Sequence, residues 1–278
     1  MAVARKLESR GAIGVCRGYL EAPRGERDTE VVFKIDPEGK FEVDYQFLME
    51  MTDQGRINQR NSRTELNIET GTWEKVYEPV YKTRLICGVD PFKYDTKKDV
   101  QLREGRQRQS DGGIAILWER DPAIDSGDDP GEWESRRFIL NYRYRCEQDE
   151  YNEDALMACV LFGAMCYPER NVDTTWKHFV KRGYGGYLLY DVDVRTGRPA
   201  REPGRYLTKE SVIELFSETS EYVKHRIHKE KFLSYMGELK SIKGPEDLTN
   251  HDLLSACGMA LLGSKSIYGK IWERQEKT

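Results

Sequence analysis

Short apolar runs separated by polar stretches mark the chain between residues 84 and 145. The first run, residues 84–89, ends abruptly in Asp90 and Pro91, which predicts a buried strand that stops at an edge of a sheet with Asp90 at its tip. Residues 113–119 and 138–145 have strand composition as well. The loops between the three runs lack helical periodicity, so we expect an antiparallel arrangement with Asp90 on a central strand.

The period of the apolar positions changes after residue 149. Residues at three- and four-residue spacing predict a helix that ends at Gly163: Tyr151, Ala155, Ala158, Cys159 and Phe162. A fourth strand over 164–169 follows and finishes on Glu169. The pattern then predicts a helix over 172–182, a fifth strand over 187–191, and two closing helices over 209–235 and 250–262.

The first part of the chain has a different pattern, with a predicted hairpin and a polar connection. Residues 31–35 and 41–47 have strand composition and are joined by Asp36-Pro37-Glu38-Gly39, which predicts a β-hairpin. Residues 51–72 are polar and without clear period, as expected for a connection. We therefore divide the chain into an N-terminal segment, 1–81, and one domain, 82–278. The latter is expected to be an α/β domain whose mixed sheet has three antiparallel strands, then two parallel strands, and helices on both faces.

Composition narrows the class of protein. The chain has 278 residues, 38% of them hydrophobic and 33% charged, which is typical of a soluble globular protein with one sizeable core. No apolar run approaches the roughly 20 residues needed to span a bilayer, and no signal-like segment opens the sequence, so we expect a cytoplasmic protein. The six cysteines are scattered, which indicates free thiols rather than a zinc site or a disulfide framework.

The net charge of the chain limits the ways in which it can bind nucleic acid. A formal net charge of -4 argues against a protein that coats nucleic acid over its whole surface, because phosphate binding depends on Lys and Arg. Local basic patches remain available. The candidate DNA-binding residues are Lys97, Lys98, Arg106 and Arg108 in one stretch and Lys224, Arg226 and Lys229 in another.

Three carboxylates stand at positions that can converge. Asp90 ends the first strand, Glu169 ends the fourth, and Asp252 lies at the start of the last helix. If the first and fourth strands are parallel neighbours, their tips emerge at one edge, where a crossing helix can add the third acid. Clustered carboxylates repel one another unless cations compensate, and oxygen ligands suit Mg²⁺ or Mn²⁺. Two such ions about 4 Å apart hydrolyse phosphodiesters. Asp191 and Asp95 are reserve ligands.

Each acid also has a structural explanation. Asp90 could cap a turn, and Glu169 could simply enter a loop after Pro168. Asp252 completes Thr249-Asn250-His251-Asp252, which resembles a capping box, so capping and metal binding are equally open for it. Catalysis by a Ser-His or Cys-His pair has little support, because no Gly-x-Ser-x-Gly motif occurs and the four histidines lie in polar, helix-like contexts.

Several motifs together resemble a known family. They are 86–92 (ICGVDPF), 142–145 (YRYR), 161–164 (LFGA), 168–171 (PERN) and 182–189 (RGYGGYLL). In order and spacing they are similar to the C-terminal nuclease domain of tailed-phage terminase large subunits, particularly those of phages of Bacteroidetes-type hosts. The resemblance covers about residues 84–263. The family's metal-binding acids fall on Asp90, Glu169 and Asp252, and Arg170 stands where relatives often have Asn.

The resemblance implies an RNase H-like fold and a two-metal endonuclease that uses Mg²⁺ or Mn²⁺ to cut concatemeric viral DNA during genome packaging in the host cytoplasm. It also implies a terminase ATPase domain, a small terminase subunit and a portal as partners. We expect the nuclease half alone, because residues 258–266 depart from a phosphate-binding loop by placing Ser264 before the Lys. Other readings are a resolvase or transposase on the same scaffold, or an inactive DNA-clamping or motor-docking module.

Overall fold

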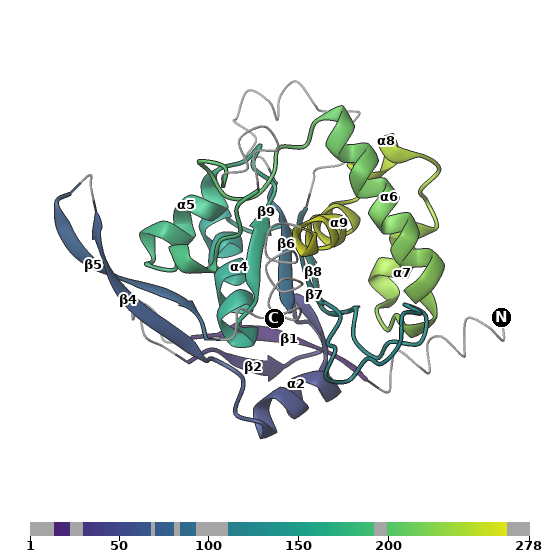
Figure 1. Ribbon diagram of the computed structural model, residues 1–278, viewed down its shortest axis with the longest axis horizontal. Coiled ribbons are helices and arrows are strands. Elements are labelled where there is room, and N and C mark those ends of the chain that lie inside the picture. Colours follow the sequence, from purple (N-terminus) through teal and green to yellow (C-terminus); the bar gives the residue numbers. More distant parts are fainter. Residues whose placement is uncertain are drawn as a thin grey trace.

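A seven-stranded mixed sheet runs through the centre of the molecule (Figure 1). The computed structural model describes residues 14–22, 30–67, 70–80, 84–92, 111–191 and 199–265. The strand order is β2-β1-β3-β8-β7-β6-β9. The strands are β1 (Val15–Glu21), β2 (Val32–Ile35), β3 (Phe41–Asp44), β6 (Leu85–Asp90), β7 (Gly112–Trp118), β8 (Arg137–Tyr144) and β9 (Met165–Pro168).

The middle of the sheet follows the predicted pattern. Strands β6, β7 and β8 pair antiparallel, and β9 lies parallel to β6 on its other side. β6 is therefore a central strand, and Asp90 is its last residue, as predicted. The α/β class with a mixed sheet and flanking helices is confirmed.

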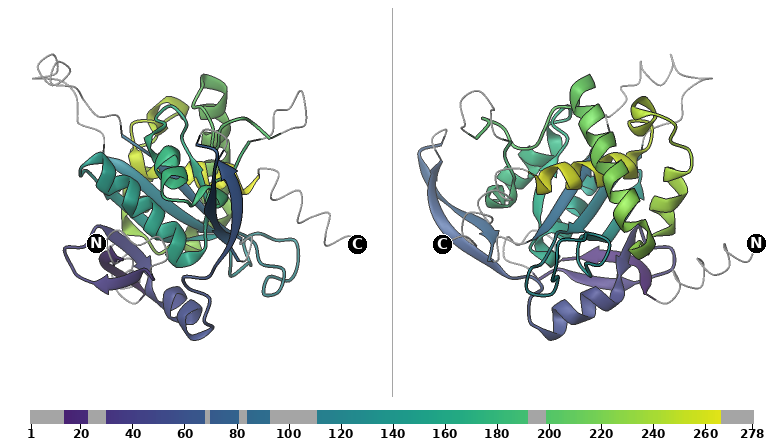
Figure 2. Two further views of the ribbon diagram at one scale, coloured as in Figure 1. Left: turned by 90° about the vertical axis from the view of Figure 1, so that its left-hand side faces the viewer. Right: turned by 45° about the vertical axis from the view of Figure 1, so that its right-hand side comes forward.

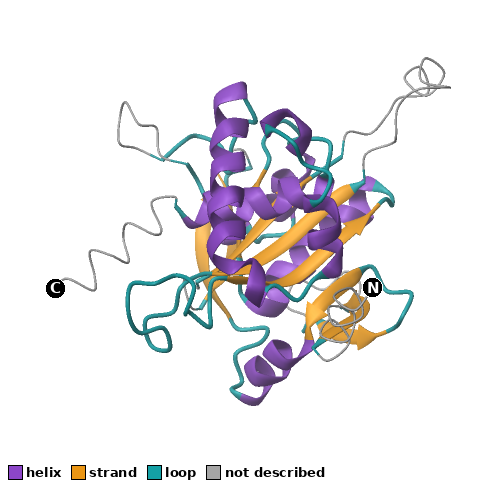
Figure 3. Ribbon diagram, turned by 90° about the vertical axis from the view of Figure 1, so that its right-hand side faces the viewer, coloured by secondary structure: helices purple, strands orange, loops and turns teal. Residues whose placement is uncertain are grey.

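Helices cover both faces of this sheet (Figures 1 and 3). The described helices are α2 (Tyr45–Asp53), α4 (Gln148–Phe162), α5 (Thr174–Lys181), α6 (Lys209–Arg226), α7 (Leu233–Leu239), α8 (Pro245–Leu248) and α9 (Asp252–Ser264). The predicted end of α4 at Gly163 is confirmed, and this residue adopts the left-handed conformation with φ 66°. One hydrophobic cluster packs α4 on the sheet, and a second packs α9 and α6 on the opposite face.

The predicted hairpin of residues 31–35 and 41–47 is wrong. A turn does form, with Gly39 N–H donating to the Asp36 carbonyl over 2.9 Å. However, β2 and β3 do not pair with each other, because β1 lies between them and pairs with both. Strand β3 then pairs with β8, so the strands of the 1–81 segment extend the same sheet as residues 82–278. The boundary proposed near residue 81 is not a break in that sheet.

Residues 51–72 are not a simple connection either. They contain the end of α2 and strand β4 (Arg60–Asn67), which pairs with β5 (Thr72–Pro79) as a separate two-stranded ribbon. Figure 2 shows this ribbon reaching along one side of the molecule. Its base is fixed by Tyr77, whose N–H donates to Gly183 O over 2.7 Å and whose ring stacks on Tyr184 at 4.9 Å. Near its far end, Trp73 is 70% exposed.

Two elements predicted after β9 differ from the expectation. The fifth strand predicted over 187–191 is absent. Tyr187 ends the 3-10 helix η1 (Gly185–Tyr187), and the next residue, Leu188, forms an isolated parallel bridge with Cys166. The long helix predicted over 209–235 is divided by η2 (Ile227–Lys229). The break arises because the buried Glu230 carboxylate accepts the N–H groups of Lys231 and Phe232. Within the part of the chain that is described, no helix is long and apolar enough to cross a membrane.

Candidate active site

Asp90 and Glu169 leave the sheet at the same edge. The parallel register places Val89 opposite Pro168, and Glu169 N–H donates to Val89 O over 2.8 Å. Asp90 and Glu169 are therefore the next residues on two adjacent strands, and their carboxyl groups lie within hydrogen-bonding reach of each other. The sequence-based expectation that these two acids meet is supported by the backbone pairing itself.

Helix α9 brings the third acid to this edge. It packs on β6 and β7 because glycines there leave room for its backbone. A Cβ atom on Gly113 would lie 2.1 Å from Asp252 O, and one on Gly88 would lie 2.0 Å from Ala256 O. Gly113 pairs directly with Asp90 in the sheet, so the first turn of α9 lies over the strand next to Asp90. The Asp252 carboxylate accepts the Asp111 N–H over 3.1 Å.

The capping explanation of Asp252 does not hold. Asp252 is the first residue of α9, and the N-cap residue His251 makes no side-chain capping bond. The Leu254 N–H is instead capped by the carboxylate of Glu238 on α7, over 3.1 Å. Glu238 therefore supplies the cap that Asp252 was a candidate for, and the Asp252 carboxylate lies near enough to Asp90 for its charge to act on it.

The charges of the three acids act on one another. Enclosure in the protein raises the pKa of Asp90 well above its ordinary value, and the negative charges of Glu169 and Asp252 raise it further, while a hydrogen bond with Ser255 acts in the opposite direction. Such a cluster of oxygen donors is the chemistry that binds hard divalent cations, which remove the mutual repulsion. The residues therefore fit Mg²⁺ or Mn²⁺.

The three acids do not form a compact ligand group in their present side-chain positions. Within the described residues, a single group of three Cys, His or acidic side chains has all its ligand atoms within 4.8 Å of one another, and this group is not Asp90, Glu169 and Asp252. At least two of these three acids are therefore farther apart than that.

The compact group consists of Cys146, Glu150 and Asp154, and its geometry could hold a metal ion. The Lys40 ammonium already contacts Glu150 and, over 3.2 Å, Asp154. The Tyr142 hydroxyl donates to Asp154 over 3.1 Å. Burial raises the pKa of Asp154 to about 6. A metal would have to displace Lys40, so we interpret this group as an internal ion-pair network that joins Lys40, the residue before β3, to α4. This group was not predicted from the sequence, although Glu150 and Asp154 are one helical turn apart.

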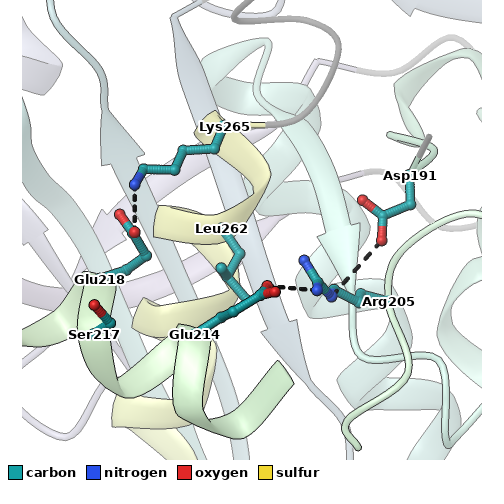
Figure 4. Close-up of a pocket in the computed structure, with 7 residues that line it drawn as sticks. All are labelled: Asp191, Arg205, Glu214, Ser217, Glu218, Leu262 and Lys265. Carbon is teal, nitrogen blue, oxygen red and sulfur yellow. Dashed lines mark hydrogen bonds and ion pairs between the residues drawn. The ribbon is translucent and has the colours of Figure 1, made fainter. Parts of the chain in front are cut away.

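The reserve ligand Asp191 has other partners. It accepts a hydrogen bond from the Tyr167 hydroxyl over 2.8 Å and lies 3.8 Å from the Arg205 guanidinium. Figure 4 shows Arg205 between Asp191 and Glu214 in a cavity of about 320 Å³. The charge of Asp191 is therefore balanced within the protein by Arg205. Asp95 lies outside the described residues.

The predicted DNA-binding residues differ in their accessibility. Arg226 is buried and donates to four carbonyl groups of the loop before β8, those of Pro130, Gly131, Ser135 and Arg136. Its guanidinium is therefore not available to a phosphate in this structure. Lys229 pairs with Glu134 over 2.6 Å, and Lys224 is exposed on α6. The other four, Lys97, Lys98, Arg106 and Arg108, lie outside the described residues.

Residues that support the acids were missed by the sequence analysis. Ser255 follows Asp252 at helical spacing, a signal that could have been used. Glu238 and Asp111 come from distant segments and carried no such signal. Comparison of the chain with protein-family models, with curated proteins and with solved structures finds no match.

Proposed function

We propose that this protein is a metal-dependent DNA endonuclease of the kind found in terminase large subunits, built on an RNase H-like sheet. The strand order β8-β7-β6-β9, with three antiparallel strands followed by a parallel one, supports this scaffold. The Cys166–Leu188 bridge stands where that fold continues into its fifth strand. Cutting of viral DNA during packaging, in the host cytoplasm and with an ATPase domain, small subunit and portal as partners, belongs to the same proposal.

One observation carries the proposal: three acids from distant parts of the sequence meet at one sheet edge. The pKa of Asp90 is raised by the charges of both Glu169 and Asp252, in addition to its enclosure. An arrangement that destabilises the protein without a ligand indicates a functional site rather than a structural one. Asp90, Glu169 and Asp252 would hold the metal ions, which supply an activated water and stabilise the leaving oxygen of a phosphodiester.

The protein's own groups hold this edge in place. The Tyr151 hydroxyl lies 3.0 Å from Asp90 O and 2.8 Å from Gly113 O, and so links the ends of β6 and β7 from the face that α4 covers. Ser255 orients Asp90 from the other face. The metal-binding edge is therefore braced on both faces, as pre-organised sites require.

The test is cleavage of supercoiled plasmid by the purified protein with Mn²⁺ or Mg²⁺ and with EDTA. Cutting is expected with the metals only. Asp90→Asn and Glu169→Gln should reduce it to background, because each removes a metal-binding charge while keeping the shape. Asp252→Asn should do the same, with little change in melting temperature, since Asp252 is not the N-cap residue of α9.

Two control variants make this test specific. Asp173→Asn changes an exposed acid whose partner is Lys177 and should leave cutting intact. Asp154→Asn disrupts the compact group with Cys146 and should also leave the metal dependence unchanged. A protein that folds and binds DNA but never cuts would favour a clamping module, and loss of cutting in Asp154→Asn alone would move the metal centre to the compact group.

A further inference from the structure

Arg143 lies in line with the acids of the candidate active site. It is on β8 and pairs with Gly113 on β7, which in turn pairs with Asp90 on β6. Since directly paired residues project to the same face of a sheet, Arg143 belongs to the face that α9 covers. Its side chain is 39% exposed, and it is part of a motif that the sequence analysis noted without assigning a role.

Arg143 contacts two acids. Its Nη1 donates to Glu238 Oε1 over 2.7 Å, and its Nε lies 3.6 Å from Asp111 Oδ2. Glu238 is nearly buried, with 7% of its side chain exposed. A buried carboxylate without a positive partner is strongly unfavourable, so the position of Glu238 depends on Arg143.

Both of these acids hold the first turn of α9. The second oxygen of Glu238 accepts the Leu254 N–H over 3.1 Å, and Asp111 donates its own N–H to the Asp252 carboxylate over 3.1 Å. Arg143 is thus connected to the Asp252 turn by two routes, one through the helix cap and one through the backbone next to β7.

We propose that Arg143 is a positioning residue that fixes Asp252 at the metal site through Glu238 and Asp111. This inference rests on the proposed function. It differs from the simpler role of joining α7 to the sheet, because an ion pair that only joins two elements affects stability alone. A positioning residue also affects metal affinity, since groups that orient ligands typically contribute ~10- to 100-fold to metal affinity or activity.

The test compares Arg143→Met, which keeps the length of the side chain and removes its charge, with Arg143→Lys, which restores the charge without the planar fork. Arg17→Met is the matched control, because Arg17 makes a similar ion pair with Glu42, over 2.9 Å, on β1 and β3. Three quantities are measured: hydrogen exchange of the Leu254 amide, Mn²⁺ affinity by calorimetry without DNA, and the cleavage rate.

In Arg143→Met, the Leu254 amide should exchange faster, and Mn²⁺ affinity and the cleavage rate should each fall by ~10- to 100-fold. Arg143→Lys should recover part of each loss, and Arg17→Met should match the wild type. Unchanged exchange, or wild-type metal affinity and cleavage in Arg143→Met, would overturn the inference alone. A wild-type protein that neither binds Mn²⁺ nor cuts DNA would overturn the proposed function and, with it, the role of Asp252 that Arg143 is said to serve.

Discussion

A single methyl group on Gly88 tests whether the packing of α9 on β6 sets the geometry of the acids. The Cβ atom of Gly88→Ala would lie 2.0 Å from Ala256 O and 2.3 Å from Ala260 N. Both are backbone atoms of α9 and cannot rotate away. Since ordinary contact begins at 3.4 Å, the helix and the strand would have to separate by about 1.4 Å.

The expected cost follows from this separation. Overpacking of a well-packed core typically costs about 1–3 kcal/mol, and Gly88→Ala should lie at the upper end because backbone must move. For a chain of this size that is a fall in melting temperature of roughly 6–12 °C. Because α9 also carries Asp252, the cleavage rate at a temperature where the variant is folded should fall further, by about 100-fold for a misplacement near 1 Å.

The assay is thermal unfolding by circular dichroism together with plasmid cleavage. Gly237→Ala is the matched control, since nothing lies within 4 Å of a Cβ atom there and the residue is in α7. It should be neutral or slightly stabilising, because Ala favours helix more than Gly. A Gly88→Ala protein with wild-type melting temperature would contradict the packing argument. If Gly88→Ala lowered the stability but left cleavage at the wild-type rate, the packing of α9 on β6 would not control the geometry of the active site.

Three further outcomes are expected. The pKa of Asp90 is raised in the folded protein, so its ionised form opposes folding. In EDTA, Asp90→Asn should raise the melting temperature at pH 7, and the difference should shrink as the pH falls and disappear below about pH 3, where the carboxyl is protonated in the folded and in the unfolded state. Arg226→Met should destabilise the protein by ~3 kcal/mol in urea unfolding, because four loop carbonyls lose their donor, and a loss of DNA affinity without loss of stability would contradict this. Trp73→Ala should change the free energy of unfolding by less than about 0.5 kcal/mol, since the side chain is 70% exposed, and a larger fall would show that the ribbon packs on the body.

The local sequence pattern was sufficient to predict an element where the residues that end it lie next to it in the chain. The apolar run before Asp90 and the helix ended by Gly163 were both predicted from neighbouring residues, and both are present. The convergence of Asp90 and Glu169 followed from one further assumption, that β6 and β9 are parallel neighbours, which the register bears out.

The errors arose where distant segments decide the outcome. The turn at 36–39 has hairpin residues, but β1 competes for both strands and lies between them. The helix predicted over 209–235 had a continuous pattern, yet the buried Glu230 carboxylate binds the backbone that would have continued it. At residues 249–252, where capping and metal binding had both been open, Glu238 caps the Leu254 N–H instead, and nothing near Asp252 in the sequence signals a partner on α7. Propensity and spacing describe local preference, whereas these choices were made by tertiary contacts.

The origin of the three acids in the chain has a consequence for biosynthesis. Asp90 and Glu169 lie on strands that the ribosome releases early, whereas Asp252 lies on the last described helix and rests over Gly113 only once that helix is free to fold. Chain elongation proceeds at about 5–20 residues per second, so a nascent chain exposes the sheet for several seconds before α9 can cover it. During that interval the face of β6 and β7 that α9 will bury is open to solvent, and the nascent chain is exposed to aggregation or chaperone binding before the acid cluster is complete.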